Sequence, residues 1–289
     1  MDQSSDADTE QALRPICEAD RRVRHHRLDF TGKPLALNQG FALARGRYLA
    51  LTDDDCEVSP QWLARIVETF SAHPQVACVF GDVAAPPYDS SKGFIPVCRV
   101  HEDSVIVGLS EFLRGPGMQR FGIGANMALR SEVVAQLGGW DPWIGPGAKF
   151  GSGDDVDMTV RVLRAGHAIA FCAEARVLHF GMRDYASLAQ QFGRNGFGSG
   201  AIFAKHLKCG AVYRGSLRLL RDRSLVAARN LIGGRRPIGA AFSLGWARGF
   251  RSGWSHPVDV RTRKFLGDPL ASGRRYTHQV AQVVRATHP

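Results

Sequence analysis

The sequence has 289 residues and a formal net charge of +10, with 44% hydrophobic and 22% charged residues. This length can bury a sizeable core, and the composition is typical of globular proteins. No run of residues approaches the length of a membrane span, and the polar, acidic start lacks the pattern of a signal peptide. The six cysteines form no CxxC pair. We therefore expect buried thiols in a reducing compartment, and a cytoplasmic protein.

The charge is distributed unevenly along the chain. Residues 181–289 hold 19 Lys and Arg against 4 Asp and Glu, whereas residues 1–180 hold 18 against 23. The acidic part would suit a cation site. The basic part would suit phosphates, an anionic membrane surface or nucleic acid, although a solvated basic tail is an equal alternative.

The first part of the chain predicts alternating helices and strands. We expect a helix over residues 8–20, a short strand over 22–30, a helix over 32–46 that stops at Gly46, and a strand over 47–52. Ser59 and Pro60 then predict the start of a helix. Its apolar face would comprise Trp62, Leu63, Ile66, Val67 and Phe70. A strand over 76–83 follows, and this order of elements predicts a largely parallel sheet covered by helices.

The middle of the chain is more irregular. Residues 84–120 are rich in glycine and proline, with a short helix expected within 102–114. Further elements are expected as a strand over 122–130, a helix from Ser131 to Leu137, a helix over 154–166, and two strands over 168–172 and 175–180.

Beyond residue 181 the pattern becomes helical and basic. We expect helices over 185–207, 216–233 and 238–250, and we divide the chain into domains at 1–182 and 183–289. The basic C-terminal part interleaves large apolar residues with arginines. Its side chains either lie on an anionic membrane or pack into a core; they are Phe242, Leu244, Trp246, Arg248, Phe250, Arg251 and Trp254.

Three adjacent carboxylates end the strand over 47–52. Asp53, Asp54 and Asp55 would repel one another and raise each other's pKa, so a bound cation is the expected partner. Alternation along an extended chain points Asp53 and Asp55 the same way, as a DxD pair that can share a cation. The alternative is an acidic turn without a ligand.

Two further features carry possible chemistry. Asp154 and Asp155 open a helix after a glycine-rich loop, where a carboxylate can act as a base on a hydroxyl group or simply favour the helix dipole. Asp157 and Arg161, four residues apart, predict a pair on the helix surface. His179 is either a metal ligand or a structural histidine.

Three blocks, taken together and in order, resemble the family 2 glycosyltransferases of the GT-A fold over residues 1–182. They are "GKPLALNQGFALARGRYLALTDDD", "GANMALRSEVVAQLGGWD" and "GDDVDMTVRVLRAGHAIAFCAEARVLHFG". The resemblance implies an α/β fold with a Rossmann-like, mostly parallel sheet flanked by helices, here followed by the basic helical region. It also implies metal-dependent, inverting transfer of a sugar from a nucleotide-diphosphate donor, commonly a UDP-sugar. The acceptor would be a glycan or lipid-linked hydroxyl, as in cell-envelope polysaccharide biosynthesis.

The resemblance also implies roles for individual residues. Asp155 would be the catalytic base, with Asp154 beside it in place of the family's usual Glu. Asp55 and His179 would hold a divalent metal, Mn²⁺ or Mg²⁺. The nucleotide-sugar would contact Asp2, Lys33, Asn38, Asp53, Asp54, Gly124, Ala125 and Asn126. Trp140 and Trp143 either stack on an acceptor ring or pack their loop.

The start of the sequence departs from the family pattern, because the usual first strand and helix are not seen before "MDQSSDADTE". Either the start codon is assigned too late or the chain is truncated. A truncated chain could be an inactive relic that binds a glycan or a partner, which is the second hypothesis for function. Nucleic-acid binding by the basic part is a third, although no known module is present.

Overall fold

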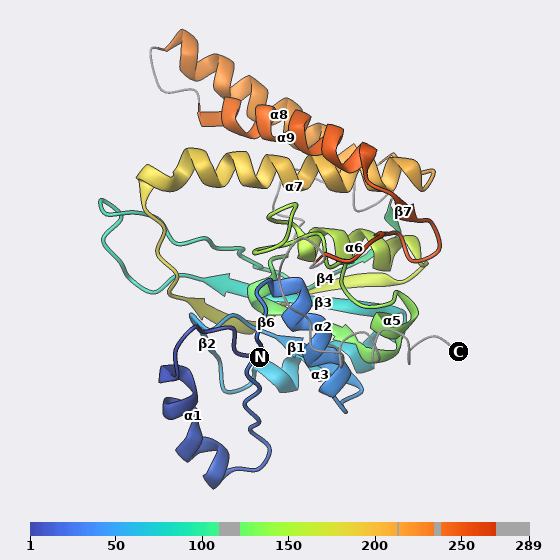
Figure 1. Cartoon of the computed structure of the whole chain (residues 1–289). Helices are drawn as coiled ribbons and strands as arrows, with labels where there is room; N and C mark the ends of the chain where they lie inside the picture. Colours follow the sequence, from blue (N-terminus) through green and yellow to red (C-terminus); the bar gives the residue numbers. More distant parts are fainter. Residues whose placement is uncertain (110–121, 213, 234–237, 270–289) are drawn as a thin grey trace.

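The fold is built around one mixed sheet with helices on both faces (Figure 1). The computed structural model describes residues 1–109, 122–212, 214–233 and 238–269. Within them, the strands of the sheet follow the order β1-β5-β3-β6-β2, and β4 also pairs with β6. Their bounds are β1 Tyr48–Leu51, β2 Cys56–Val58, β3 Val76–Ala84, β4 Ser104–Val107, β5 Met127–Arg130 and β6 Ala168–His179. The predicted α/β class is confirmed.

The direction of the strands differs from the prediction of a mostly parallel sheet. Among the described pairings, β3 and β6 are parallel, while β1–β5, β3–β5, β2–β6 and β4–β6 are antiparallel. The strand β5 lies between β1 and β3 and runs against both. The order of local elements, from which a largely parallel sheet was predicted, does not reveal this long-range pairing.

Two hydrophobic clusters fill the space between the sheet and its helices. On one face, α3 (Trp62–Ala72) buries Trp62, Ile66 and Phe70. The other face is covered by α5 (Ser131–Gln136), α6 (Asp154–Arg164) and α7 (Leu188–Lys208). The alternation of β3 contributes to both, since Val79 packs into the first cluster and Phe80 into the second.

Several boundaries differ from the sequence predictions. The helix expected at Ser59 begins at Trp62, and Leu63 and Val67, expected on its apolar face, are exposed. Residues 104–107 form a strand, not part of a helix, while the rest of that prediction extends into 110–121, outside the described residues. The two short strands expected over 168–180 form one continuous β6. β6 pairs with β3 on both sides of residues 173–175, where the register shifts at an irregularity of the ladder.

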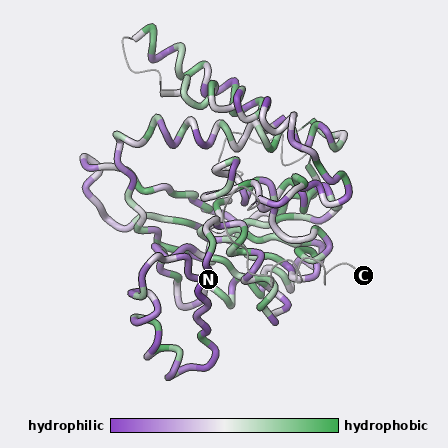
Figure 2. The backbone as a smooth tube through the Cα atoms, viewed as in Figure 1, coloured by the Kyte–Doolittle hydropathy of each residue, from purple (hydrophilic) through white to green (hydrophobic). Residues whose placement is uncertain are grey.

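The N-terminal part was predicted more closely. The helices are α1 (Asp8–Ala19) and α2 (Lys33–Leu43). No residue of α1 is buried, and Figure 1 shows this helix set apart from the sheet. The strand expected over 22–30 is not formed; a single bridge joins Asp2 to Arg27. Figure 2 shows α1 as mostly hydrophilic and the central strands as hydrophobic.

The C-terminal helices form a layer of their own beside the sheet (Figure 1). This layer comprises η3 (Tyr185–Ser187), α7, α8 (Arg214–Ile232), α9 (Ile238–Ser255) and a small hairpin of β7 (Val258–Asp259) and β8 (Lys264–Phe265). Glycines on both helices permit close packing of α7 against α9. A Cβ on Gly200 of α7 would lie 2.1 Å from the Trp246 carbonyl oxygen, and one on Gly249 of α9 would lie 1.9 Å from that of Phe197. The core cluster that contains residues of α6 also contains Ala201, Ile202 and Phe203 of α7. The domain boundary at residue 182 stays a prediction.

The large apolar residues of α9 divide between core and surface. Phe242 is buried, and the rings of Trp246 and Phe250 lie 5.4 and 6.0 Å from Phe203 of α7. Leu244 and Trp254 are 62% and 50% exposed. Packing into a core is thus observed for Phe242, Trp246 and Phe250, and contact of this helix with a membrane stays a prediction. None of the described helices is long and apolar enough to cross a membrane.

Candidate functional site

A small pocket opens where β1 ends and α6 begins. Its polar lining includes Lys33 from α2, Asp53 after β1, Gly124 from the turn η2 (Gly124–Asn126), and Asp154 and Asp155 from the first turn of α6. Ligands commonly bind beyond the carboxyl ends of strands in α/β folds. Five of the residues predicted as donor-binding or catalytic are thus brought to one place by four separate segments.

Lys33 is the cation of this pocket. Its ammonium group forms an ion pair with Asp53. Burial lowers the pKa of Lys33, but the negative charges of Asp154, Asp53 and Asp155 outweigh burial and raise it. The lysine therefore stays charged, and it offsets the repulsion among three carboxylates.

Asp154, which is buried, and Asp155, which is half-buried, are the acids at the N-terminus of α6. Burial raises the pKa of Asp154 to about 7, the charge of Asp155 adds to this rise, and Lys33 opposes it. Burial also raises the pKa of Asp155, against hydrogen bonds that its carboxylate accepts from the N–H groups of Val156 at 2.7 Å and Gly124 at 3.1 Å. A carboxylate with a raised pKa is a stronger base, so either could accept a proton from a hydroxyl group near neutral pH.

Asp55 and His179 lie together beside this pocket. The antiparallel pairing of β2 with β6 places Cys56 opposite His179, and the His179 Nε2 lies 3.3 Å from the Asp55 Oδ1. The other ring nitrogen, Nδ1, lies 3.0 Å from the Pro96 carbonyl oxygen. Because a carbonyl only accepts, Nδ1 donates to Pro96, and Nε2 is the ring nitrogen that faces the carboxylate.

These residues fit a divalent cation. A nitrogen lone pair and a carboxylate oxygen are both electron donors, and the hydrogen bond to Pro96 orients the ring as in other histidine–metal sites. Gly181 leaves the room that such an ion needs, because a Cβ there would lie 2.2 Å from the Asp55 Oδ2 and 2.9 Å from the His179 Nε2. The cluster also includes Cys56, which the sequence reasoning did not select. Its signal was its place directly after the aspartate triplet.

Two predicted donor-binding asparagines have structural partners. Asn38 is paired with the backbone of Trp140, donating to its carbonyl at 3.1 Å and accepting from its N–H at 2.8 Å. Asn126 is 1% exposed; it accepts from the Trp62 indole at 2.8 Å and donates to the Asp82 and Ala175 carbonyls. Asn126 thus uses both of its N–H groups and its oxygen, and Asn38 uses one of each, in holding the walls of the pocket.

The remaining predicted donor contacts differ in their surroundings. Asp2 is buried and accepts hydrogen bonds from Ser4, while His25 Nε2 lies 2.9 Å from its carboxylate. These interactions lower its pKa, with the Ser4 hydroxyl contributing most. Asp54 is exposed, and Ala125 is buried beside Gly124. No contact joins these three residues to the charged groups of the pocket among the described interactions.

The two tryptophans predicted to meet an acceptor are mostly packed. Trp140 is 2% exposed and belongs to the main core, although its edge contributes to the pocket wall. As placed, it has no free face on which a sugar ring could stack, so the alternative of loop packing is the correct one for this residue. Trp143 is half-buried. Its ring centroid lies 4.4 Å from that of His256 in an edge-on arrangement, and the Lys149 ammonium lies over its ring.

Asp157 and Arg161 are not a surface pair, as the helical spacing had indicated; both are buried. Asp157 lies 2.6 Å from the Lys205 ammonium and 3.1 Å from His206, both on α7. Arg161 donates to backbone carbonyls of the 137–139 turn and of Thr262. The spacing revealed that the two residues share a face of α6, but not that α7 and the C-terminal hairpin cover it.

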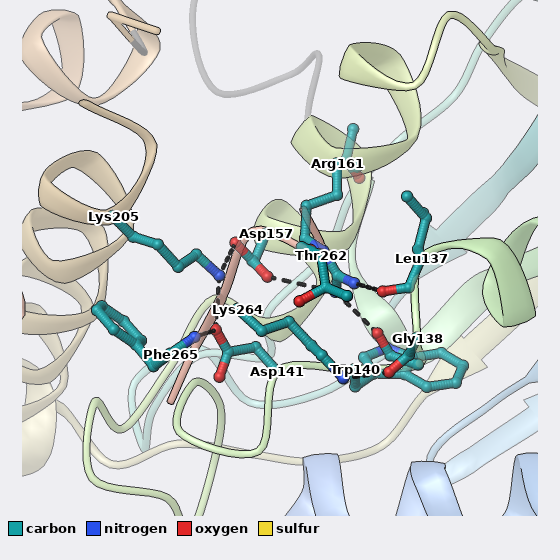
Figure 3. Close-up of polar contacts among 12 residues, drawn as sticks. Leu137, Gly138, Trp140, Asp141, Asp157, Arg161, Lys205, Thr262, Lys264 and Phe265 are labelled. Atoms are coloured by element: carbon teal, nitrogen blue, oxygen red, sulfur yellow. Dashed lines mark hydrogen bonds and ion pairs between the residues drawn. The ribbon is translucent and has the colours of Figure 1, made fainter. Parts of the chain in front are cut away.

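This buried charge network connects distant parts of the chain (Figure 3). Lys205 also lies 2.7 Å from Asp141, whose carboxylate accepts from the Phe265 N–H at 2.9 Å. Lys264 donates to the Gly138 carbonyl. Ion pairs and hydrogen bonds thus connect α7 and β8 to α6 and to the loop that follows α5.

The model of the family described as "Glycosyltransferase like family 2" matches residues 2–198. The glucosyl-dolichyl phosphate glucuronosyltransferase of Haloferax volcanii is 26% identical over 166 residues, which are 56% of this chain and 52% of the relative. The chain therefore spans about half the length of this curated relative.

A similar fold is found among solved structures. The mannosyltransferase PcManGT from Pyrobaculum calidifontis, in complex with GDP-Man and Mn²⁺, superposes with a TM-score of 0.56 at 17% sequence identity. The match covers 86% of this chain and 76% of that one. It supports the same overall fold.

Proposed function

The chain belongs to the glycosyltransferase-like family 2, and from this premise we propose that it transfers a sugar from a nucleotide-diphosphate donor to an acceptor hydroxyl group. The observation that carries the proposal is the meeting of Lys33, Asp53, Asp154 and Asp155 around one pocket, with Asp55 and His179 beside it. This arrangement offers a base, a cation and a metal-binding pair at a single site.

Each part of the site has a task in the proposed reaction. Asp155 accepts the proton of the acceptor hydroxyl as that oxygen attacks the anomeric carbon, and direct displacement of the diphosphate inverts this carbon. Lys33 supplies positive charge near the departing diphosphate. Asp55 and His179 would hold a divalent cation, which when bound stabilises the growing negative charge of the leaving group.

The similar proteins guide the proposed choice of metal and acceptor. PcManGT is described with GDP-Man and Mn²⁺, which supports a divalent metal, Mn²⁺ or Mg²⁺. The donor proposed first is a UDP-sugar, with GDP- and dTDP-sugars as the next to test. The name of the Haloferax volcanii relative gives a glucosyl-dolichyl phosphate as its substrate, which supports a lipid-linked or glycan acceptor of the kind used in polysaccharide biosynthesis at the cell envelope.

A lipid-linked acceptor would require the protein to approach a membrane surface. We propose that α8 and α9 provide this contact from the cytoplasmic side. Apolar side chains of α8 are exposed along one stripe, with Leu217 at 40%, Leu225 at 50% and Ile232 at 87% exposure. Arg214 and Arg221 are exposed on the same helix, and basic residues beside apolar ones favour an anionic interface. Flotation with vesicles containing an anionic lipid, against neutral vesicles, tests this contact.

The substitution Asp155→Asn tests the proposed function. Because general-base catalysis contributes roughly 10²–10⁴ in rate, we expect this variant to lose most of its turnover and to keep donor binding. Turnover would be measured by nucleotide release across UDP-, GDP- and dTDP-sugars with Mn²⁺, and donor binding by calorimetry. Asp20→Asn, which changes an exposed aspartate after α1, is the matched control. Retained turnover in Asp155→Asn would refute the assignment of the base.

A further inference from the structure

The cluster beside the pocket contains a thiol that the proposed function does not use. We propose that Cys56 is a third protein ligand of the cation at Asp55 and His179, and that its sulfur gives this site a preference for Zn²⁺ and Co²⁺ over Mg²⁺. The inference rests on the metal role proposed above for Asp55 and His179. It concerns which atoms bind the metal, because the negative charge of the acidic triplet does not by itself determine which metal is preferred.

The distances between the three donor atoms suit one small cation. The Cys56 Sγ lies 3.8 Å from the Asp55 Oδ1, and this oxygen lies 3.3 Å from the His179 Nε2. All three donor atoms lie within 4.8 Å of one another. In a tetrahedral zinc site, bond lengths of about 2.0–2.3 Å separate neighbouring ligands by about 3.3–3.6 Å. Coordination therefore needs only small side-chain movements.

The sheet fixes two of these donors in place. Cys56 and His179 are directly opposite each other in the antiparallel pair β2–β6, so their side chains extend from the same face of the sheet. The His179 side chain is 5% exposed and is oriented by the Pro96 carbonyl. Asp55 is adjacent to Cys56 in the chain, and its side chain is 36% exposed. A metal could thus reach the cluster from the Asp55 side, while the other two ligands stay fixed.

The electrostatics of the cluster also call for a positive charge. The His179 Nε2 lies 3.3 Å from the Asp55 Oδ1, with its Nδ1 turned toward the Pro96 carbonyl. Two electron donors at 3.3 Å repel each other unless a proton or a cation lies between them. The room left by Gly181 is next to these same two atoms. A divalent cation there would satisfy both, and it would take the Cys56 sulfur as a neighbour.

The sulfur changes which metals bind best. Thiolates favour softer ions such as Zn²⁺, whereas Mg²⁺ and Mn²⁺ favour oxygen ligands. A site of one carboxylate, one imidazole and one thiolate is therefore expected to bind Co²⁺ and Zn²⁺ more tightly than Mn²⁺, and Mg²⁺ most weakly. The thiol proton leaves to solvent when the sulfur coordinates.

Absorption spectroscopy with Co²⁺ tests the sulfur ligand directly, without an activity measurement. The full-length protein titrated with Co²⁺ should show a near-ultraviolet thiolate-to-cobalt charge-transfer band. Cys56→Ser should lose this band and bind Co²⁺ at least 10-fold more weakly, a loss no smaller than that caused by removing outer partners of metal ligands. Cys209→Ser, which changes another half-buried thiol at the end of α7, should keep both.

The outcomes separate this inference from the proposed function. Co²⁺ binding that depends on Asp55 and His179 but shows no charge-transfer band, or a band that persists in Cys56→Ser, would overturn the role of Cys56 and leave the metal site intact. Absence of Co²⁺, Zn²⁺ and Mn²⁺ binding would overturn the metal role itself. Donor turnover that persists under metal chelation would count against the proposed reaction, whatever the spectrum shows.

A second measurement uses the unchanged protein and so avoids any folding defect of a variant. Iodoacetamide labelling of each cysteine is followed by mass spectrometry with and without saturating Zn²⁺. We expect Zn²⁺ to slow labelling of Cys56 at least 10-fold and to leave Cys17 and Cys209 unchanged. Equal labelling of Cys56 in both conditions would overturn the inference.

Discussion

Lys205 of α7 lies 2.6 Å from Asp157, which is on α6 two residues after Asp155. The same ammonium group lies 2.7 Å from Asp141, next to Trp140 in the pocket wall. One buried lysine of the C-terminal region therefore joins the helix that carries the proposed base to the loop that borders the pocket.

We expect Lys205→Met to destabilise the protein strongly. The substitution leaves the Asp141 and Asp157 carboxylates buried without their shared cation, and breaking a buried pair in this way costs about 3–5 kcal/mol. Urea unfolding would measure the loss. Arg251→Met, which changes an exposed basic residue on α9, is the control and should alter the free energy of unfolding by less than about 0.5 kcal/mol. Similar stability of the two variants would contradict the role given to the network.

The stability of the protein should depend on pH through Asp154. Burial and the charge of Asp155 raise the pKa of Asp154 in the folded state to about 7, above the ordinary value of 3.8 for an aspartate, so protonation of this carboxyl favours the folded state. This contribution is fully present below about pH 4 and is lost as the pH rises toward 7. An asparagine at position 154 does not ionise, so Asp154→Asn should not lose stability as the pH rises. The free energy of unfolding of the variant, relative to that of the wild type, should therefore increase between pH 4 and pH 7, by roughly 1–4 kcal/mol. Unfolding at pH 5 and pH 8, without donor or metal, measures the difference; an equal difference at both values would contradict the prediction.

Asn126→Ala should affect stability and not donor recognition. The change leaves the Trp62 indole N–H and the carbonyls of Asp82 and Ala175 without their partner, and each unpaired buried group costs about 1–3 kcal/mol. Asn195→Ala, at an exposed position of α7, is the control. Donor affinity per folded molecule, measured by calorimetry below the unfolding transition, should stay within about 3-fold of the wild type, equivalent to about 0.6 kcal/mol. A loss of affinity without a loss of stability would instead support the role in the donor pocket.

Gly181→Ala should weaken metal binding. The added methyl group would lie 2.2 Å from the Asp55 Oδ2, and the backbone of Gly181 lies outside the positive-φ region, so the effect is steric and local. We expect Mn²⁺ or Co²⁺ affinity to fall at least 10-fold, as for changes around other metal sites. Gly193→Ala is the matched control, since its methyl group would make an ordinary contact of 3.6 Å. Equal metal affinity in the two variants would place the ion elsewhere.

The candidate site was predictable in part because its main residues stand at the ends of elements with clear local patterns. Asp53 follows a short apolar strand, and Asp154 and Asp155 open an amphipathic helix. The structure brings both to the pocket with Lys33. Asn38 and Asn126 show the limit of this reasoning, because an amide that binds a ligand and one that ties two loops together have the same place in a sequence pattern.

The sequence by itself determined the α/β class, most of the helices, and the positions of the carboxylates at the ends of their elements, because these depend on interactions between near neighbours in the chain. Only the tertiary structure decided that β5 separates β1 from β3, that Cys56 faces His179, and that α7 covers Asp157 and Arg161. Each of these depends on the register or packing of segments far apart in sequence. The free energy that selects them comes from burial and pairing across the whole fold, which no local pattern contains.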